Sequence, residues 1–166
     1  MRNISAIVYT SGTGFTRRYA QMLSRASAIP AYDLEDGRSA PADGTRVIYL
    51  GWLWAGQIKG LSKARKRWAV EAVCAVGMAP DYPLEKLAQE NKTGSLPLFF
   101  VQGGYAPEKL RGLNKIMMRA MTKQMTKKPP KDEAEAGMQK LFLHGGDFVS
   151  EDRLAPLLSW LREEHR

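Results

Sequence analysis

Residues 10–16, with the sequence TSGTGFT, combine residue types and a spacing that suit the binding of an anion. The stretch follows an apolar run at 4–9 and precedes a helical pattern that begins near Thr16, so we predict a turn between a strand and a helix. The first turn of a helix presents unpaired backbone N–H groups at the positive end of its dipole. Three hydroxyl groups add donors, and two glycines let the backbone approach a ligand closely. The expected ligand is therefore a phosphate.

The candidate phosphate ligands are the six residues of this turn: Ser11, Gly12, Thr13, Gly14, Phe15 and Thr16. A P-loop nucleotide hydrolase is excluded, because no Gly-Lys-Ser/Thr sequence follows the glycines. A polar turn that binds nothing remains an alternative, since Gly, Ser and Thr are ordinary turn residues.

A dinucleotide-binding fingerprint is a second alternative at the same turn. Gly12 and Gly14 could form half of it, and its ribose-binding acid would lie about 20 residues further on. Asp33 and Glu35 lie near that position. However, Arg17 occupies the place of the third glycine, where close packing of the helix leaves no room for a side chain. The number of hydroxyl groups also fits a terminal phosphate better than a bridging pyrophosphate.

The rest of the chain has a pattern that would position this turn. Five apolar runs predict strands at 4–9, 31–34, 46–50, 70–76 and 96–101, and helical patterns are found at 16–26, 58–68, 84–90 and 152–163. Pro30 favours an edge position for the second strand. Strands that alternate with helices imply right-handed crossovers and a parallel sheet. We therefore predict a doubly wound α/β fold with helices on both faces of the sheet.

Two further segments are expected beside the phosphate turn. The first is an aromatic loop after the third strand, with residues Trp52, Leu53, Trp54, Ala55 and Gly56. Two indoles outside regular structure usually pack on something flat or apolar. The second is a turn after the fourth strand that contains Gly77 and Met78. In a sheet of order 2-1-3-4-5, these ends flank the switch point, where ligands of open α/β sheets bind.

Residues 109–131 depart from the alternating pattern. They contain four methionines, no acidic residue and eight cations, namely Lys109, Arg111, Lys115, Arg119, Lys123, Lys127, Lys128 and Lys131. The spacing predicts a basic amphipathic helix that ends at Pro129 and Pro130, with a methionine face suited to an anionic membrane or a flexible partner. A plain crossover helix that covers one side of the sheet is the alternative. After it we expect a solvated acidic linker at 132–135, an extended piece at 141–143 and a last helix capped by Ser150.

The totals limit the class of protein. With 166 residues, 44% of them hydrophobic, the chain has the size of one domain that buries about 70% of its unfolded surface. The single cysteine, Cys74, permits no internal disulfide. The chain has no long apolar run, so we expect a soluble, cytoplasmic protein. A net charge of +8 indicates acidic partners such as an anionic membrane, nucleic acid or a polyanionic substrate.

The spacing Ser11-x-Thr13-Gly14-x-Thr16 resembles the phosphate loop of flavodoxins, which binds flavin mononucleotide (FMN) without a lysine. The whole pattern is similar to the flavodoxin superfamily, although Trp52 stands where the superfamily usually has a small residue. Within that superfamily, the sequence LRGLNKIMMRAM at 110–121 resembles the insertion of the flavodoxin-type protoporphyrinogen oxidases. The resemblance implies one flavodoxin-like domain over 1–166, with a basic, methionine-rich helical insertion at about 106–131.

The resemblance also implies a function, that of an FMN-dependent oxidoreductase. Residues 11–16 would hold the phosphate of FMN, the segments at 52–56 and 77–78 would border the flavin ring, and Trp54 would stack on it. The implied partners are a tetrapyrrole substrate with propionate groups and a quinone or other electron acceptor. Residues 109–131 would contact the inner face of the membrane. No catalytic acid or base, metal or nucleic acid is expected. The alternatives are a one-electron carrier flavodoxin, and a basic membrane or nucleic-acid adaptor with an empty pocket.

Overall fold

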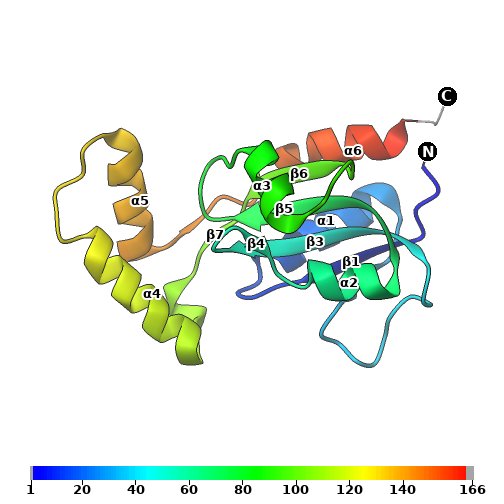
Figure 1. Ribbon diagram of the computed structural model, residues 1–166, viewed down its shortest axis with the longest axis horizontal. Helices are drawn as coiled ribbons and strands as arrows, with labels where there is room; N and C mark the ends of the chain where they lie inside the picture. The colour runs from blue at the N-terminus through cyan, green and yellow to red at the C-terminus, as the bar shows by residue number, and fades with distance from the viewer. Residues whose placement is uncertain (1, 164–166) are drawn as a thin grey trace. The chain divides into compact units, whose positions relative to one another are not determined.

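The computed structural model describes residues 2–163 of the chain (Figure 1). The chain divides into two compact units. The first unit comprises Met1–Gly103 and Val149–Arg166, and the second comprises Gly104–Phe148. The insertion expected at about 106–131 lies inside the second unit.

The first unit is built on a parallel sheet. Within the described residues the sheet has five parallel strands, β1 (Ala6–Thr10), β2 (Ala31–Asp33), β3 (Arg46–Trp54), β5 (Ala69–Gly77) and β6 (Leu98–Gln102). Their order is β2-β1-β3-β5-β6, and every neighbouring pair is parallel. When the parallel strands alone are counted, this is the predicted order 2-1-3-4-5, with β2 at the edge as expected. The prediction of a flavodoxin-like α/β fold is confirmed.

Helices cover both faces of this sheet, as predicted (Figure 1). One face packs against α1 (Phe15–Ser27) and α6 (Ala155–Arg162), where Ile7, Ile48 and Cys74 are fully buried. The other face packs against α2 (Leu61–Arg67) and α3 (Leu84–Asn91), with Val47 and Tyr49 fully buried. The central strands are therefore apolar on both sides, which explains their near-continuous hydrophobic runs.

The aromatic segment after the third strand is not a loop, so this prediction was wrong. Strand β3 continues to Trp54, turns at Ala55 and Gly56, and returns as β4 (Gln57–Ile58), which pairs antiparallel with β3. The φ angles of Ala55 and Gly56 are 47° and 78°, as in the two-residue turns that suit twisted hairpins. The indoles of Trp52 and Trp54 therefore lie on a hairpin.

The helix expected at 58–68 begins later, at Leu61. Ile58 is used by β4, and Gly60, with φ 78°, is the N-cap of α2. The last helix also differs from the expected one. A 3₁₀ turn, η2 (Glu151–Leu154), precedes α6, and the Ser150 side chain makes no capping hydrogen bond.

The second unit contains a short antiparallel ribbon and two helices. The ribbon pairs β7 (Gly104–Tyr105) with β8 (Gly146–Asp147), and the 3₁₀ turn η1 (Pro107–Lys109) follows β7. Helix α4 spans Gly112–Met125 and helix α5 spans Glu133–His144. The basic helix thus ends at Met125, before the proline pair that we expected to stop it.

Two expectations for the segment after α4 were wrong. The expected acidic linker at 132–135 begins α5, because Asp132 is its N-cap and accepts a hydrogen bond from Glu135 N–H at 2.7 Å. Acidic side chains at that position also favour the positive end of the helix dipole. The residues expected to be extended, 141–143, form the last turn of the same helix, in which Leu141 and Phe142 are buried.

No helix within residues 2–163 is both long and apolar enough to cross a membrane. The same part of the chain contains no cluster of three or more His, Cys, Asp or Glu side chains that could hold a metal ion.

Candidate functional site

The predicted phosphate turn connects the carboxyl end of β1 to the start of α1. Gly14 is the N-cap of α1 with φ 105°, a backbone conformation that residues with a side chain rarely adopt. Ser11 Oγ accepts hydrogen bonds from the N–H groups of Gly14 at 3.1 Å and Arg17 at 3.2 Å. These bonds use both acceptor positions of the hydroxyl group, so its proton is left to donate to a ligand.

Several N–H groups of this turn have no acceptor within the described residues. The first helical hydrogen bond runs from Arg18 N–H to the Gly14 carbonyl at 3.1 Å. No hydrogen bond among residues 2–163 uses the N–H groups of Gly12, Thr13, Phe15 or Thr16. Together with the helix dipole, these groups form a site in which an anion would replace water.

The aromatic hairpin lies directly beside this turn. Thr10 pairs with Gly51 in the sheet, which places Trp52 next to the first residues of the turn. A Cβ built on Gly12 would be 3.4 Å from Cε2 of Trp52, so the indole covers this glycine. The rings of Trp52 and Trp54 meet edge to face, with centroids 6.0 Å apart and planes at 67°. The structure therefore brings together two of the three predicted site segments through direct contact.

The other predicted residues of the hairpin are placed differently. Leu53 lies on the opposite face of the strand from the two indoles and packs against the core beneath α2 and α3. Ala55 is exposed at the tip of the hairpin, and Gly56 is buried next to Glu90 of α3. Among the five predicted ring contacts of the hairpin, only Trp52 and Trp54 present side chains on the face that Gly12 shares.

The third predicted segment, Gly77 and Met78, follows β5 on the next strand of the sheet. Trp52 pairs with Val76, so Gly77 lies one residue beyond that pair. The Met78 carbonyl accepts a hydrogen bond from Gln102 Nε2 at 3.0 Å, and Gln102 Oε1 accepts one from Arg153 at 3.3 Å. The conformation of the 77–78 turn is thus fixed by a buried side chain at the end of β6.

Sequence reasoning did not assign any role to Gln102 or Gly103. A Cβ on Gly103 would lie 2.7 Å from Cγ1 of Val76 and 3.0 Å from Cβ of Phe15, so the first residue of α1 packs against this glycine. The paired glycines at 103 and 104 were the available signal, because a glycine after a buried strand often marks close approach of another segment. Gly103 therefore sets how closely the start of α1, which follows the turn at 11–16, approaches β6.

A second missed group is the phenol of Tyr49, which joins three segments beneath the turn. Its oxygen lies 2.5 Å from the Lys59 carbonyl and 2.8 Å from Thr10 Oγ1. A carbonyl can only accept, so the phenol donates to Lys59 and the Thr10 hydroxyl donates to the phenol. Burial raises the pKa of Tyr49 well above its ordinary value, and the phenol stays protonated. The end of β1 is thereby attached to the segment that follows β4.

The acidic residue required by the dinucleotide alternative is already engaged. Asp33 Oδ2 accepts a hydrogen bond from Arg17 at 3.3 Å, and Asp33 Oδ1 accepts one from Glu35 N–H at 3.0 Å. The hydrogen bond to Asp33 raises the pKa of the Arg17 guanidinium. A ribose hydroxyl would have to compete with these partners, which disfavours the dinucleotide interpretation.

Comparison with known proteins assigns no family to this chain. No protein-family model matches the chain, and no curated protein has a significantly similar sequence. One similar solved structure is an adenine phosphoribosyltransferase from Thermoanaerobacter pseudethanolicus ATCC 33223, at 12% identity and TM-score 0.41 over 61% of this chain and 70% of that chain. Another is a protein named provisionally as a flavoprotein from Bacteroides uniformis ATCC 8492, at 12% identity and TM-score 0.39 over 61% of this chain and 88% of that chain. At these values neither name is transferred to this chain.

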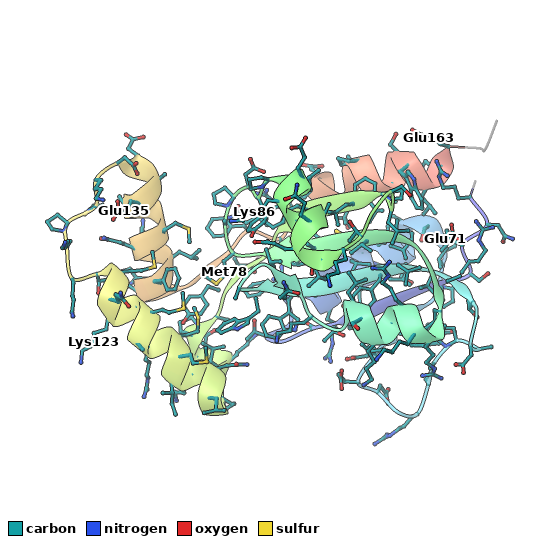
Figure 2. All side chains as sticks on the ribbon, viewed as in Figure 1. Glu71, Met78, Lys86, Lys123, Glu135 and Glu163 are labelled. Atoms are coloured by element: carbon teal, nitrogen blue, oxygen red, sulfur yellow. The ribbon has the colours of Figure 1, made fainter. Side chains whose placement is uncertain are left out.

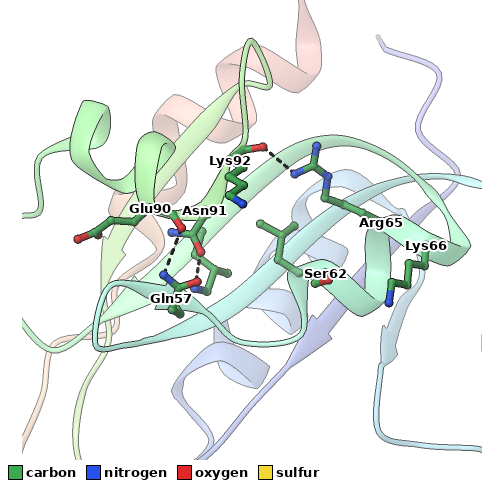
Figure 3. A pocket seen from close by; sticks show the side chains of 9 residues that line it. Gln57, Ser62, Arg65, Lys66, Glu90, Asn91 and Lys92 are labelled. Carbon is green, nitrogen blue, oxygen red and sulfur yellow. Dashed lines mark hydrogen bonds between the residues drawn. The ribbon is translucent and has the colours of Figure 1, made fainter.

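A separate cavity of about 470 Å³ lies between β4, α2 and α3 (Figure 3). It contains none of the predicted site residues; its lining is Gln57, Ile58, Leu61, Ser62, Arg65, Lys66, Glu90, Asn91 and Lys92. Asn91 connects the hairpin to α3, because Nδ2 donates to the Gly56 carbonyl at 2.8 Å and to the Leu87 carbonyl at 2.9 Å, and Oδ1 accepts from Ile58 N–H at 2.7 Å. Asn91 and Gln57, which donates to the Glu90 carbonyl at 3.1 Å, therefore attach to α3 the hairpin that carries Trp52 and Trp54.

The arrangement at the carboxyl ends of the strands is suited to a phosphorylated molecule with a flat ring system. The N–H groups at 12–16 offer an anion site at one end, and the indole of Trp52 extends an aromatic surface from it. Lys59 Nζ lies 5.8 Å from the centre of the Trp52 ring and adds positive charge beside it. The chain thus combines N–H groups that have no acceptor within residues 2–163 with an apolar platform, at the position where this sheet topology places ligands.

Proposed function

We propose that the chain binds FMN at the carboxyl ends of β1, β3 and β5 and acts as an FMN-dependent oxidoreductase. The observation that carries this proposal is the set of backbone N–H groups at 12, 13, 15 and 16 that have no acceptor within residues 2–163. A phosphate monoester needs several donors arranged around one point, and a helix N-terminus with flanking hydroxyl groups supplies them.

Each part of FMN would have its own set of residues. The backbone at 12–16 and the hydroxyl groups of Ser11, Thr13 and Thr16 would bind the phosphate. Trp52 and Trp54 would supply the apolar contact for the ring, and the peptide groups at 77–78 would supply hydrogen bonds to its polar edge. When bound, FMN supplies the redox chemistry, and the residues of this chain set its position and the access of water.

The basic character of the chain supports an anionic substrate and argues against a simple electron carrier. Its net charge of +8 is opposite to the acidic surface on which electron-carrier flavodoxins dock with their partners. We infer a protoporphyrinogen oxidase-like activity, in which a tetrapyrrole with propionate groups approaches the flavin edge and a quinone or other acceptor removes the electrons. The cations at 109–131 would raise the local concentration of such a substrate. The residues of the site are not required to act as acid or base.

The experiment is to titrate purified, flavin-free protein with FMN and with riboflavin and to follow flavin fluorescence. The proposal requires FMN to bind much more tightly than riboflavin, because riboflavin lacks the phosphate. Equal affinities would show that the turn at 11–16 is not the phosphate site. The FMN-loaded protein is then given protoporphyrinogen and a quinone. Turnover separates an oxidoreductase from a carrier that only exchanges electrons with a protein partner.

A further inference from the structure

Helix α4 has an exposed apolar face. Leu113, Ile116, Met117 and Met121 are exposed to 76%, 64%, 48% and 44%, respectively. Their spacing of three, four and eight residues places them on one side of the helix. The sheet of the first unit has its own covering helices on both faces, so it does not need α4 as a cover. The four side chains form what we call the apolar stripe.

A row of cations lies next to the apolar stripe. Lys115, Arg119 and Lys123 repeat every four residues and occupy the neighbouring side of α4. Helix α4 contains no acidic residue, and the acids of the second unit lie within η1, at the start of α5 and on β8. Figure 2 shows this separation, with Lys123 on α4 and Glu135 on the first turn of α5. We call the three residues the cationic row.

The opposite side of α4 is attached to α5 within the same unit. Met118 is only 3% exposed. Gln139 Nε2 donates hydrogen bonds to the carbonyl groups of Met125 at 2.9 Å and Lys128 at 3.0 Å. The ring of Phe142 on α5 meets the ring of Tyr105 on β7, with centroids 5.8 Å apart. The buried side of α4 is thus the one that carries Met118, and the apolar stripe and the cationic row are presented on the other sides of a preformed helix.

We propose that the apolar stripe and the cationic row of α4 dock this protein on an anionic lipid bilayer. An interfacial helix places its apolar side chains in the acyl boundary while lysine and arginine reach the headgroup phosphates beside them. The four side chains are exposed to 44–76%, as insertion into lipid requires. A second copy of the chain is less suitable as an occupant, since two cationic rows would then approach each other. This proposal is independent of FMN binding.

The test uses flavin-free protein and vesicles of phosphatidylcholine with and without phosphatidylglycerol. We expect co-sedimentation with the anionic vesicles only, and a steep loss of binding as salt is added, because the cations act through screened charges. Replacement of the cationic row by Lys115→Gln, Arg119→Gln and Lys123→Gln should lower the partition coefficient on the order of 100-fold, from about fivefold for each cation.

A matched control removes the same charge elsewhere. Lys63→Gln, Arg65→Gln and Lys66→Gln change three exposed cations on α2 and should leave vesicle binding within about threefold of the parent. A second variant, Ile116→Gln with Met117→Gln, keeps every charge and alters only exposed positions, and it should abolish binding at moderate salt. Far-ultraviolet circular dichroism checks that each variant retains its helices.

Three outcomes of the vesicle experiment would overturn the proposal. The first is a parent protein that does not bind anionic vesicles, the second is an α2 variant that loses as much binding as the α4 variant, and the third is binding that does not respond to salt. Light scattering tests the other candidate occupant, a second copy of the chain. A parent protein that is dimeric and an Ile116→Gln, Met117→Gln variant that is monomeric would assign the apolar stripe to a dimer interface and overturn the proposal. Vesicle binding is measured without flavin, so the two proposals are tested separately. A protein that does not bind vesicles could still bind FMN, and a protein that does not bind FMN could still bind vesicles.

Discussion

The indole of Trp52 covers Gly12, since a Cβ on Gly12 would be 3.4 Å from Cε2 of the ring. This contact joins the turn with the unpaired N–H groups to the hairpin formed by β3 and β4. Trp52 also meets Trp54 edge to face. A substitution in the hairpin should therefore alter the turn. The contact between Trp52 and Gly12 can thus be used to test whether the two segments form one site.

Replacement of Trp52 by alanine should weaken FMN binding by about tenfold, because an aromatic contact contributes roughly 0.5–1.5 kcal/mol beyond its buried area. Flavin fluorescence in the complex should increase as well, since a neighbouring indole quenches it. The measurement is a fluorescence titration, and Trp160→Phe is the control because Trp160 packs against Phe99 and the guanidinium of Arg2 instead. Unaltered affinity and fluorescence in Trp52→Ala would place the flavin ring elsewhere.

The double substitution Thr13→Ala and Thr16→Ala should reduce FMN affinity severely. Two charge-assisted hydrogen bonds to the phosphate are lost, at roughly 1.5–3 kcal/mol each. Affinity for riboflavin should not change, which separates loss of phosphate contacts from general damage. Thr122→Ala with Thr126→Ala, two hydroxyl groups that bond to helix carbonyls of the second unit, is the matched control. A titration in which the double variant binds FMN like the parent would remove the phosphate site from this turn.

Gly103→Ala should destabilise the protein by about 1–3 kcal/mol, the usual cost of inserting atoms into a packed core. The added Cβ would lie 2.7 Å from Val76 Cγ1 and 3.0 Å from Phe15 Cβ. Because Phe15 begins α1, FMN affinity should fall at the same time. The control is Gly37→Ala, where a Cβ has no neighbour within 4 Å. Urea unfolding curves compare the two variants, and equal midpoints would contradict the close approach.

Stability should decrease at alkaline pH because of a buried thiol. Burial raises the pKa of Cys74 to about 12 from its ordinary value of 9.0. The unfolded state loses this proton near pH 9 while the folded state keeps it, so the stabilising contribution is complete below pH 9 and is lost as pH rises toward 12. The free energy of unfolding should fall by up to about 1.4 kcal/mol per pH unit from this group.

The measurement is urea unfolding at several pH values from neutral upward, for the parent and for Cys74→Ala. The variant will be less stable throughout because it leaves a small cavity, but its decline above pH 9 should be shallower. In the parent, a thiol reagent should react with Cys74 only when the protein unfolds. Parallel curves for the two proteins would show that Cys74 does not contribute to the alkaline transition.

The fold could be predicted because its signals are local. The central strands are buried on both faces, so their apolar runs are almost continuous, and Pro30 correctly indicated the edge strand. The hairpin was not predicted because the contact that explains it is a tertiary one. Gly51 looks like the end of a strand, yet it lies inside β3, where a Cβ would be 2.6 Å from the Lys59 carbonyl. A glycine is needed at position 51 because a later segment packs closely against it. The hydrophobic periodicity of β3 does not reveal this contact.

For the candidate site, the sequence indicates where the turn lies, and its role as a phosphate site stays a prediction. The turn at 11–16 has a short sequence signature, so it could be located, and the structure places it between β1 and α1. Gln102 and Tyr49 could not be found in this way, because each acts on a segment that is distant in the sequence. The segment at 132–135 was misjudged because acidic residues are common both in solvated linkers and in the first turn of a helix.

Because the ribbon of β7 and β8 closes the second unit, the length of that unit can vary independently of the parallel sheet. Tyr105 pairs with Gly146, so the chain enters and leaves this unit on adjacent strands. The segment between two adjacent strands can be lengthened, shortened or replaced without straining the parallel sheet. Each doubling of the length of such a segment costs only about 0.6 kcal/mol in loop-closure entropy. The length and composition of the second unit could therefore change at little cost to the parallel sheet of the first unit.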